Sequence, residues 1–138
     1  MDEAIDELYK LIDKNLENDD FPVAAVIFDE TGVISSAYNS RNKTQITIDH
    51  AEISAIIKAN KKVNSWRLPN VCMLTSLEPC DMCKNVIKEA RIKQVYYLIP
   101  RYNYKYQYKN TRFHLMKLED KKLTEYKRII RSFFKDKR

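Results

Sequence analysis

The stretch Pro79-Cys80-Asp81-Met82-Cys83, together with His50-Ala51-Glu52 earlier in the chain, decides the architecture that we expect. One histidine and two cysteines are the ligand types of a tetrahedral zinc site that keeps its fourth position open. Cys80 and Cys83 are three residues apart, so on the first turn of a helix their side chains share a face. The positive end of that helix favours the thiolate form that binds zinc. We therefore expect His50, Cys80 and Cys83 to hold one Zn²⁺ ion.

Outward from these motifs, short apolar runs predict strands. Strands are expected over residues 21–28, 33–38, 71–76 and 94–99. The turn between the first two holds Gly32, the only glycine of the chain, and predicts a hairpin.

Apolar residues at helical spacing predict the helices. Helices are expected over residues 2–15, 49–60, 79–90 and 120–138. Asp49 is the expected N-cap of the second helix, and Pro79 is expected to open the third, because proline is tolerated in a first helical turn. The alternation of strands and helices predicts one α/β domain over residues 1–138. Its three layers would be a mixed central sheet of about five strands with helices on both faces.

Composition bounds the class of protein. The first residues, Met1-Asp2-Glu3, are acidic, and neither a positively charged segment nor an apolar run follows the pattern of a signal peptide. This argues against a secretory signal. We expect no membrane segment because eighteen consecutive apolar residues occur nowhere. An odd count of three cysteines, two of them in a metal-type pair, favours a reducing cytoplasm.

The basic residues are concentrated in the last third of the chain. Residues 91–138 hold fifteen of the 25 lysines and arginines but only four of the 19 acidic residues. Such an imbalance predicts a polyanionic partner, with nucleic acid first among the candidates. A lysine-rich solvated surface is the alternative, and charge by itself does not exclude it.

Glu52 supplies a carboxylate that can move protons without binding the metal. Zinc lowers the pKa of its bound water toward neutrality, and Glu52 would take that proton and deliver it to the leaving group. The alternative is a structural zinc site, which usually has four protein ligands. Neither Cys72, expected inside a strand, nor the isolated His114 is placed convincingly as a fourth ligand.

With both motifs in place, the chain resembles the tRNA-specific adenosine deaminases of the cytidine deaminase superfamily. The H-x-E and P-C-x-x-C patterns match the signature of zinc deaminases. Residues 21–26, Tyr38-Asn39-Ser40 and Phe133-Phe134 with its basic tail also follow the family. The resemblance implies a cytidine deaminase-like fold and conversion of the wobble adenosine of an anticodon to inosine. It also implies His50, Cys80 and Cys83 as zinc ligands and Glu52 as the proton shuttle.

The same resemblance implies the substrate contacts. Asn39 would hydrogen-bond the substrate, and Val23 and Leu77 would line the base pocket. A homodimer with one zinc per subunit is also implied. The chain departs from the family at Leu98-Ile99-Pro100-Arg101, at Phe113-His114 and at Asp49, in loops that would contact the flanking nucleotides.

Residues 101–109 alternate tyrosine with polar or basic residues. At a period of two this places tyrosine rings on one face and positive charges on the other, an arrangement suited to splayed bases and their backbone. An edge strand that buries its tyrosines is the alternative for the rings. The candidate RNA-binding residues are Arg101, Lys105, Lys109, Arg131, Lys135 and Arg138.

The leading hypothesis is thus a zinc-dependent hydrolase that deaminates adenosine in the tRNA anticodon loop. The second is a zinc deaminase of a free base or nucleotide, such as cytosine, guanine or dCMP, since a shared catalytic core does not fix the substrate. The basic last third separates the two, because a small substrate does not require it. The third, a non-catalytic RNA-binding module, has no use for Glu52.

Overall fold

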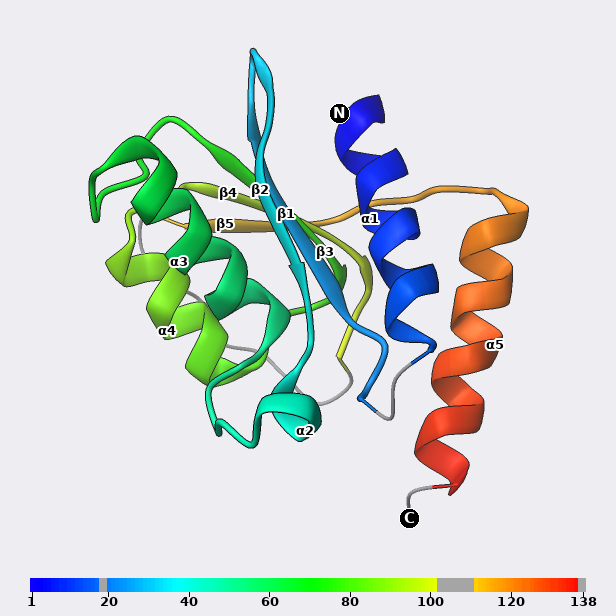
Figure 1. Ribbon diagram of the computed structural model, residues 1–138. Helices are drawn as coiled ribbons and strands as arrows, with labels where there is room; N and C mark the ends of the chain where they lie inside the picture. The colour runs from blue at the N-terminus through cyan, green and yellow to red at the C-terminus, as the bar shows by residue number, and fades with distance from the viewer. Residues whose placement is uncertain (18–19, 102–110, 137–138) are drawn as a thin grey trace.

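A five-stranded mixed sheet forms the centre of the structure, a computed structural model that describes residues 1–17, 20–101 and 111–136, with side chains up to residue 133 (Figure 1). Its strands are β1 (Ala24–Asp29), β2 (Gly32–Tyr38), β3 (Cys72–Leu77), β4 (Gln94–Ile99) and β5 (Arg112–Leu115). They lie in the order β2-β1-β3-β4-β5. β1 is antiparallel to both of its neighbours, whereas β3, β4 and β5 run parallel.

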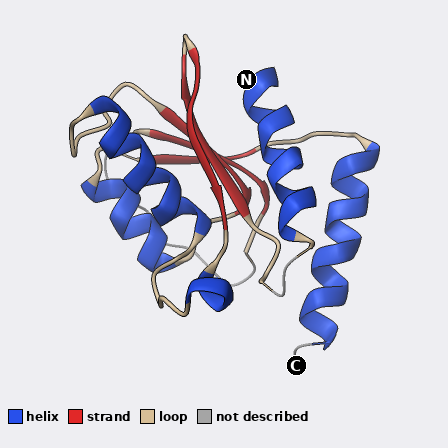
Figure 2. Cartoon of the chain, viewed as in Figure 1, coloured by secondary structure: helices blue, strands red, loops and turns tan. Residues whose placement is uncertain are grey.

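Helices cover both faces of this sheet (Figure 2). The helices are α1 (Asp2–Asn15), α2 (Arg41–Thr44), α3 (Ala51–Val63), α4 (Asp81–Glu89) and α5 (Lys121–Asp136). α3 and α4 lie on one face and α1 and α5 on the other, while the short α2 lies at the end of the sheet where β2 finishes. The predicted three-layer arrangement with a mixed sheet is confirmed.

Strand β1 shows why both faces must be covered. Ala25 and Ile27 pack in the cluster formed with α3 and α4, whereas Ala24, Val26 and Phe28 pack in the cluster formed with α1 and α5. Because side chains alternate along a strand, a run without polar residues has an apolar surface on each side. All five of these residues are buried, so β1 is a central strand of the core.

The amphipathic terminal helices form the second apolar layer. Leu8 and Ile12 of α1 and Leu123, Tyr126 and Ile130 of α5 are buried in one cluster. Their spacing of three or four residues places each set on one helix face, which then packs against the sheet.

The structure corrects two predicted helix starts and adds two short elements. Asp49 is not the N-cap of α3; His50 occupies that position, and Asp49 instead accepts a hydrogen bond from the Thr44 hydroxyl at 2.6 Å. α4 begins at Asp81 with Cys80 as its N-cap, so Pro79 precedes the helix. Strand β5 and helix α2 were not predicted from the sequence. Of the helices described, none has both the length and the apolar character needed to cross a bilayer.

Candidate metal centre

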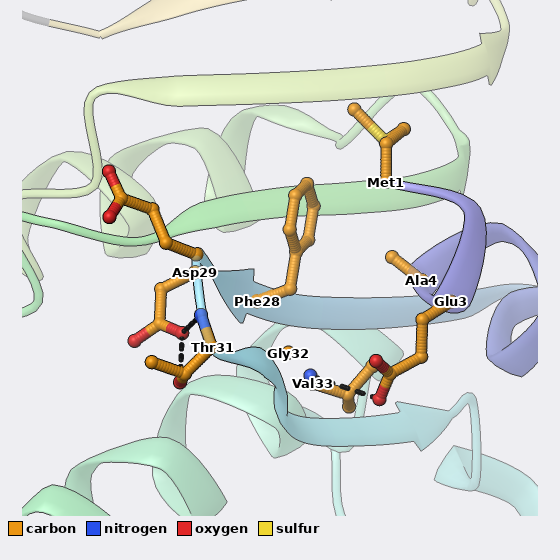
Figure 3. A pocket seen from close by; sticks show the side chains of 9 residues that line it. Met1, Glu3, Ala4, Phe28, Asp29, Thr31, Gly32 and Val33 are labelled. Carbon is orange, nitrogen blue, oxygen red and sulfur yellow. Dashed lines mark hydrogen bonds between the residues drawn. The ribbon is translucent and has the colours of Figure 1, made fainter.

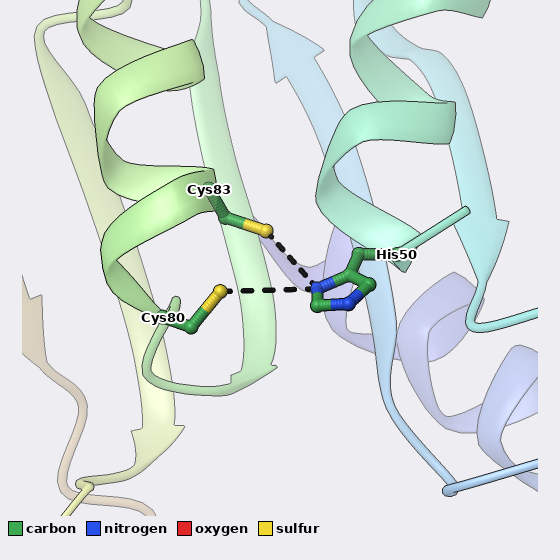
Figure 4. Close-up of side chains that lie close together, drawn as sticks. All are labelled: His50, Cys80 and Cys83. Atoms are coloured by element: carbon green, nitrogen blue, oxygen red, sulfur yellow. Dashed lines mark hydrogen bonds between the residues drawn. The ribbon is translucent and has the colours of Figure 1, made fainter. Parts of the chain in front are cut away.

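The three predicted ligands meet where two helices begin (Figure 4). His50 is the N-cap of α3, Cys80 is the N-cap of α4, and Cys83 lies in the first turn of α4. The side chains point toward one another from these two elements. The expectation that two helix N-termini converge at this place is confirmed, and their positive ends favour anionic sulfur ligands.

The donor atoms have a spacing that suits a metal ion. The His50 Nδ1 atom lies 3.4 Å from the Cys83 sulfur and 3.8 Å from the Cys80 sulfur. All three donors lie within 4.8 Å of one another. Zinc bonds of about 2.0–2.3 Å in a tetrahedron separate neighbouring ligand atoms by about 3.5 Å. The residues therefore fit a zinc ion, and Nδ1 is the His50 nitrogen that faces the two sulfurs.

The contact between the two thiols shifts their pKa values in opposite directions. The hydrogen bond with Cys83, and then that with His50, outweigh burial and lower the pKa of Cys80 to about 3. The same contact with Cys80, followed by burial, raises the pKa of Cys83 well above its ordinary range. The contact with Cys80 also raises the pKa of His50. A divalent cation between the sulfurs would offset the repulsion that opposes ionisation of the second thiol, so these three donors suit a cation.

Glu52 lies beside the ligands without joining them. It belongs to the first turn of α3, and only 2% of its surface is exposed. Burial raises its pKa, and its interaction with Cys83 opposes that shift. A buried carboxyl with a raised pKa is suited to accept and return protons.

The three predicted pocket residues lie at the ends of strands: Val23 directly before β1, Asn39 directly after β2 and Leu77 at the end of β3. Val23 and Leu77 are buried at the adjoining ends of β1 and β3. The Asn39 side-chain amide donates to the Phe21 carbonyl oxygen at 3.2 Å, so it fixes the chain that enters β1. Their contacts with a substrate stay predictions.

The candidate RNA-binding residues are placed unevenly. Arg101 follows β4, where its Nε atom donates to the Glu78 carbonyl oxygen at 2.6 Å. Arg131 is exposed on α5. Lys135 lies in α5 beyond the last described side chain, and Lys105, Lys109 and Arg138 lie outside the described residues, as do the tyrosines of residues 102–108.

Sequence reasoning missed a buried ion pair beside the metal centre. The Lys84 ammonium lies 2.7 Å from a carboxylate oxygen of Glu78, and both side chains are almost fully buried. No spacing in the sequence indicated this pair, because adjacent residues of a helix point in different directions and Lys84 therefore does not share the face of Cys83.

A surface pocket elsewhere is separate from this centre. It lies between the start of α1 and the tip of the β1–β2 hairpin, residues 28–33 (Figure 3). Val23 marks the opposite end of β1, and none of the predicted site residues lines the pocket.

Comparison with known proteins identifies the family. The model of the cytidine and deoxycytidylate deaminase zinc-binding region matches residues 1–99, which include all three candidate ligands and Glu52. The chain belongs to this family. The expected cytidine deaminase-like fold is thereby confirmed.

Two relatives are named as tRNA-specific adenosine deaminases, the family that the sequence motifs resemble. A tRNA-specific adenosine deaminase of Buchnera aphidicola subsp. Schizaphis graminum is 32% identical over 132 residues, covering 88% of this chain and 85% of the relative. One of Streptococcus pyogenes is 35% identical over 91 residues, covering 66% of this chain. The chain spans only 57% of that relative's length.

Solved structures of family members include two different activities. A structure from a study of A-to-I editing by tRNA:A34 deaminases is 30% identical, with a TM-score of 0.68 over 71% of this chain and 75% of the other. The guanine deaminase of Bacillus subtilis is also 30% identical, with a TM-score of 0.66 over 70% of this chain and 62% of the other. The fold is therefore shared with a structure from a study of tRNA:A34 deaminases and with a guanine deaminase.

Proposed function

We propose that this deaminase hydrolyses the wobble adenosine of a tRNA anticodon to inosine and ammonia. One observation carries the proposal: three metal donors lie within 4.8 Å of one another, with the buried carboxylate of Glu52 beside them. Three protein ligands leave a fourth metal position open, as in catalytic zinc sites. The relatives named as tRNA-specific adenosine deaminases support the choice of substrate.

The residues divide the work. His50, Cys80 and Cys83 would hold one zinc ion per subunit, which when bound supplies a water activated at neutral pH. The Glu52 carboxylate takes one proton from the attacking water and delivers it to the ring nitrogen. It then carries the second proton, from the hydroxyl added to the ring carbon, to the amino group, which leaves as ammonia. Val23 and Leu77 exclude water around the flipped base, and Asn39 holds the nucleotide in place.

The basic last third of the chain supports RNA as the polymer that is bound. Two of the candidate residues have described side chains: Arg101 contacts Glu78, two residues before Cys80, and Arg131 is exposed on α5. Lys105, Lys109, Lys135 and Arg138 complete the proposed set of RNA-binding residues. Phosphate contacts by such residues give affinity that falls as salt concentration rises.

The alternative is deamination of a free base or nucleotide. The similarity to a guanine deaminase, at the same identity as to the tRNA:A34 deaminase, favours this second candidate. It does not account for the excess of positive charge in residues 91–138, which is why we place it second.

A homodimer in a reducing cytoplasm is part of the proposal. Ile46, Ile48 and Ile57 are 43–50% exposed in α3 and the segment before it, and a second copy of the chain that covered them would bury their apolar surface. A reducing compartment keeps Cys80 and Cys83 available as metal ligands. Light scattering of the purified protein tests the dimer directly.

The experiment is incubation of the purified zinc-loaded protein with a transcript that carries adenosine at the wobble position, read out as inosine. A matched transcript with guanosine at that position, free cytosine, free guanine and dCMP are incubated in parallel. Inosine in the first transcript alone supports the proposal. Ammonia from a free base or nucleotide, with the transcript unchanged, overturns it in favour of the alternative.

A further inference from the structure

An ion pair encloses the metal-binding turn in sequence and in space. Glu78 precedes Cys80 by two residues, and Lys84 follows Cys83 directly. The Lys84 Nζ atom lies 2.7 Å from Glu78 Oε2, with side-chain exposures of 4% and 10%. We call this pair the Glu78–Lys84 clasp. Removing two charges from water costs free energy that offsets their mutual attraction. The Glu78–Lys84 clasp therefore adds little net stability to the fold.

Glu78 also joins the ends of two parallel strands. Its backbone N–H donates to the Ile99 carbonyl oxygen at 2.8 Å, where β4 ends. Its second carboxylate oxygen accepts the backbone N–H of Arg101 at 3.1 Å, and its carbonyl oxygen accepts the Arg101 Nε–H at 2.6 Å. The segment between β3 and Cys80 is thereby fixed to the end of β4.

Lys84 fixes the other end of the turn. Its backbone N–H donates to the Cys80 carbonyl oxygen at 2.8 Å, which closes the first turn of α4. Its ammonium lies 5.1 Å from the centre of the Phe113 ring in β5, within range of a cation–π interaction. The four residues from Cys80 to Cys83 are therefore held at both ends, by Glu78 before them and Lys84 after them.

We propose that Glu78 and Lys84 are positioning residues, whose ion pair sets the spacing of the Cys80 and Cys83 sulfurs. Groups that orient metal ligands commonly change metal affinity by about 10- to 100-fold when they are removed. The effect on metal affinity is independent of the substrate, and only the effect on turnover rests on the proposed function. Without the clasp, Cys80 follows a segment that is no longer anchored to α4.

The test compares Lys84→Met, Glu78→Gln and the double variant with the wild-type chain. The readouts are zinc affinity by chelator competition, the visible absorption spectrum of the cobalt-substituted protein, and urea denaturation. Glu89→Gln is the matched control, because it removes the exposed Arg91–Glu89 pair at the other end of α4. We expect zinc affinity to fall about 10- to 100-fold in both single variants, with altered cobalt bands, and to stay unchanged in the control.

The double variant separates positioning from stability. It leaves no uncompensated buried charge, so its resistance to urea is expected to recover relative to the single variants. Zinc affinity that stays low in the double variant supports the clasp as a positioning device. Affinity and cobalt spectrum that return to the wild-type values overturn it, and so do single variants with unchanged affinity. If a single variant fails to fold, the double variant still gives the answer.

Failure of the proposed function has a different signature. A wild-type chain that binds zinc but leaves tRNA unedited overturns the proposed function, while loss of zinc affinity in the double variant still supports the clasp. A double variant with normal zinc affinity beside a wild-type chain that edits tRNA overturns the clasp alone.

Discussion

The hydroxyl of Tyr126 donates to the carbonyl oxygen of Pro22 at 2.7 Å, so helix α5 is tied to the residue directly before Val23. Tyr126 is 2% exposed, and its hydroxyl also lies 2.9 Å from the Ser76 hydroxyl in β3. Burial, the largest influence, raises the pKa of Tyr126, so the hydroxyl remains a donor at every physiological pH. The last helix thus holds the strand entry that forms one side of the proposed base pocket.

Removal of this hydroxyl should cost measurable stability. Tyr126→Phe leaves the Pro22 carbonyl oxygen without that donor, and a buried polar atom left unpaired costs about 1–3 kcal/mol. Urea denaturation measures the loss. Tyr9→Phe is the control, because the Tyr9 hydroxyl contacts Asp120 only at 3.3 Å and its loss should be smaller. Equal losses in the two variants would contradict this reading.

Glu52→Gln should separate metal binding from turnover. Glutamine keeps the shape of the side chain but cannot take a proton, and a general acid–base group contributes about 10²- to 10⁴-fold to rate. We expect full zinc content by elemental analysis and a loss of inosine formation of at least that order. Loss of zinc in this variant would instead make Glu52 part of the metal-binding structure.

The three cysteines offer an internal comparison of ligand roles. Cys80→Ala and Cys83→Ala should each lose zinc and lower the thermal midpoint, because metal binding contributes to folding free energy. Cys72→Ala, at the start of β3 and apart from the cluster, should keep its zinc. Zinc content and thermal unfolding of the three variants decide the point, and a zinc-loaded, active Cys80→Ala would refute the ligand assignment.

The raised pKa of Glu52 predicts a pH dependence of stability in metal-free protein. Below its ordinary pKa of 4.5, Glu52 is protonated and its burial carries no penalty for a charge. As pH rises through the raised pKa of the folded state, the buried carboxylate becomes charged and the free energy of unfolding falls. Metal-free Glu52→Gln should therefore gain stability over metal-free wild type as pH rises. The gain should vanish below about pH 4.5. Urea midpoints of chelator-treated proteins across pH measure it, and a gain that does not change with pH would contradict the assignment.

The sequence predicted long elements best, because their apolar periodicity persists over several turns or pleats. The expected helix over residues 2–15 and the expected strand over 94–99 coincide with α1 and β4. Strand β5 has four residues and alternates little between buried and exposed, so its pattern is too short to distinguish it from a loop. Helix α2 has no buried residue, which leaves no apolar stripe to detect.

At the site, residue types and spacing predicted the cluster of His50, Cys80 and Cys83, because a metal restricts both. The partners of charged side chains could not be predicted in the same way. Asp49 resembles an N-cap in sequence, but the nearby Thr44 hydroxyl engages its carboxylate. From the sequence, Lys84 is expected to be a solvated lysine. Its buried ion pair with Glu78 depends on tertiary contacts that only the structure shows.

The position of Tyr126 in the last helix has a consequence for the order of synthesis. A ribosome delivers chains from the N-terminus, so His50, Cys80 and Cys83 are made well before Tyr126. A nascent chain therefore contains all three candidate metal ligands before the Tyr126 hydroxyl can donate to the Pro22 carbonyl oxygen. Metal capture can therefore precede completion of the proposed pocket during translation, because the hydrogen bond to Pro22 requires α5 to dock.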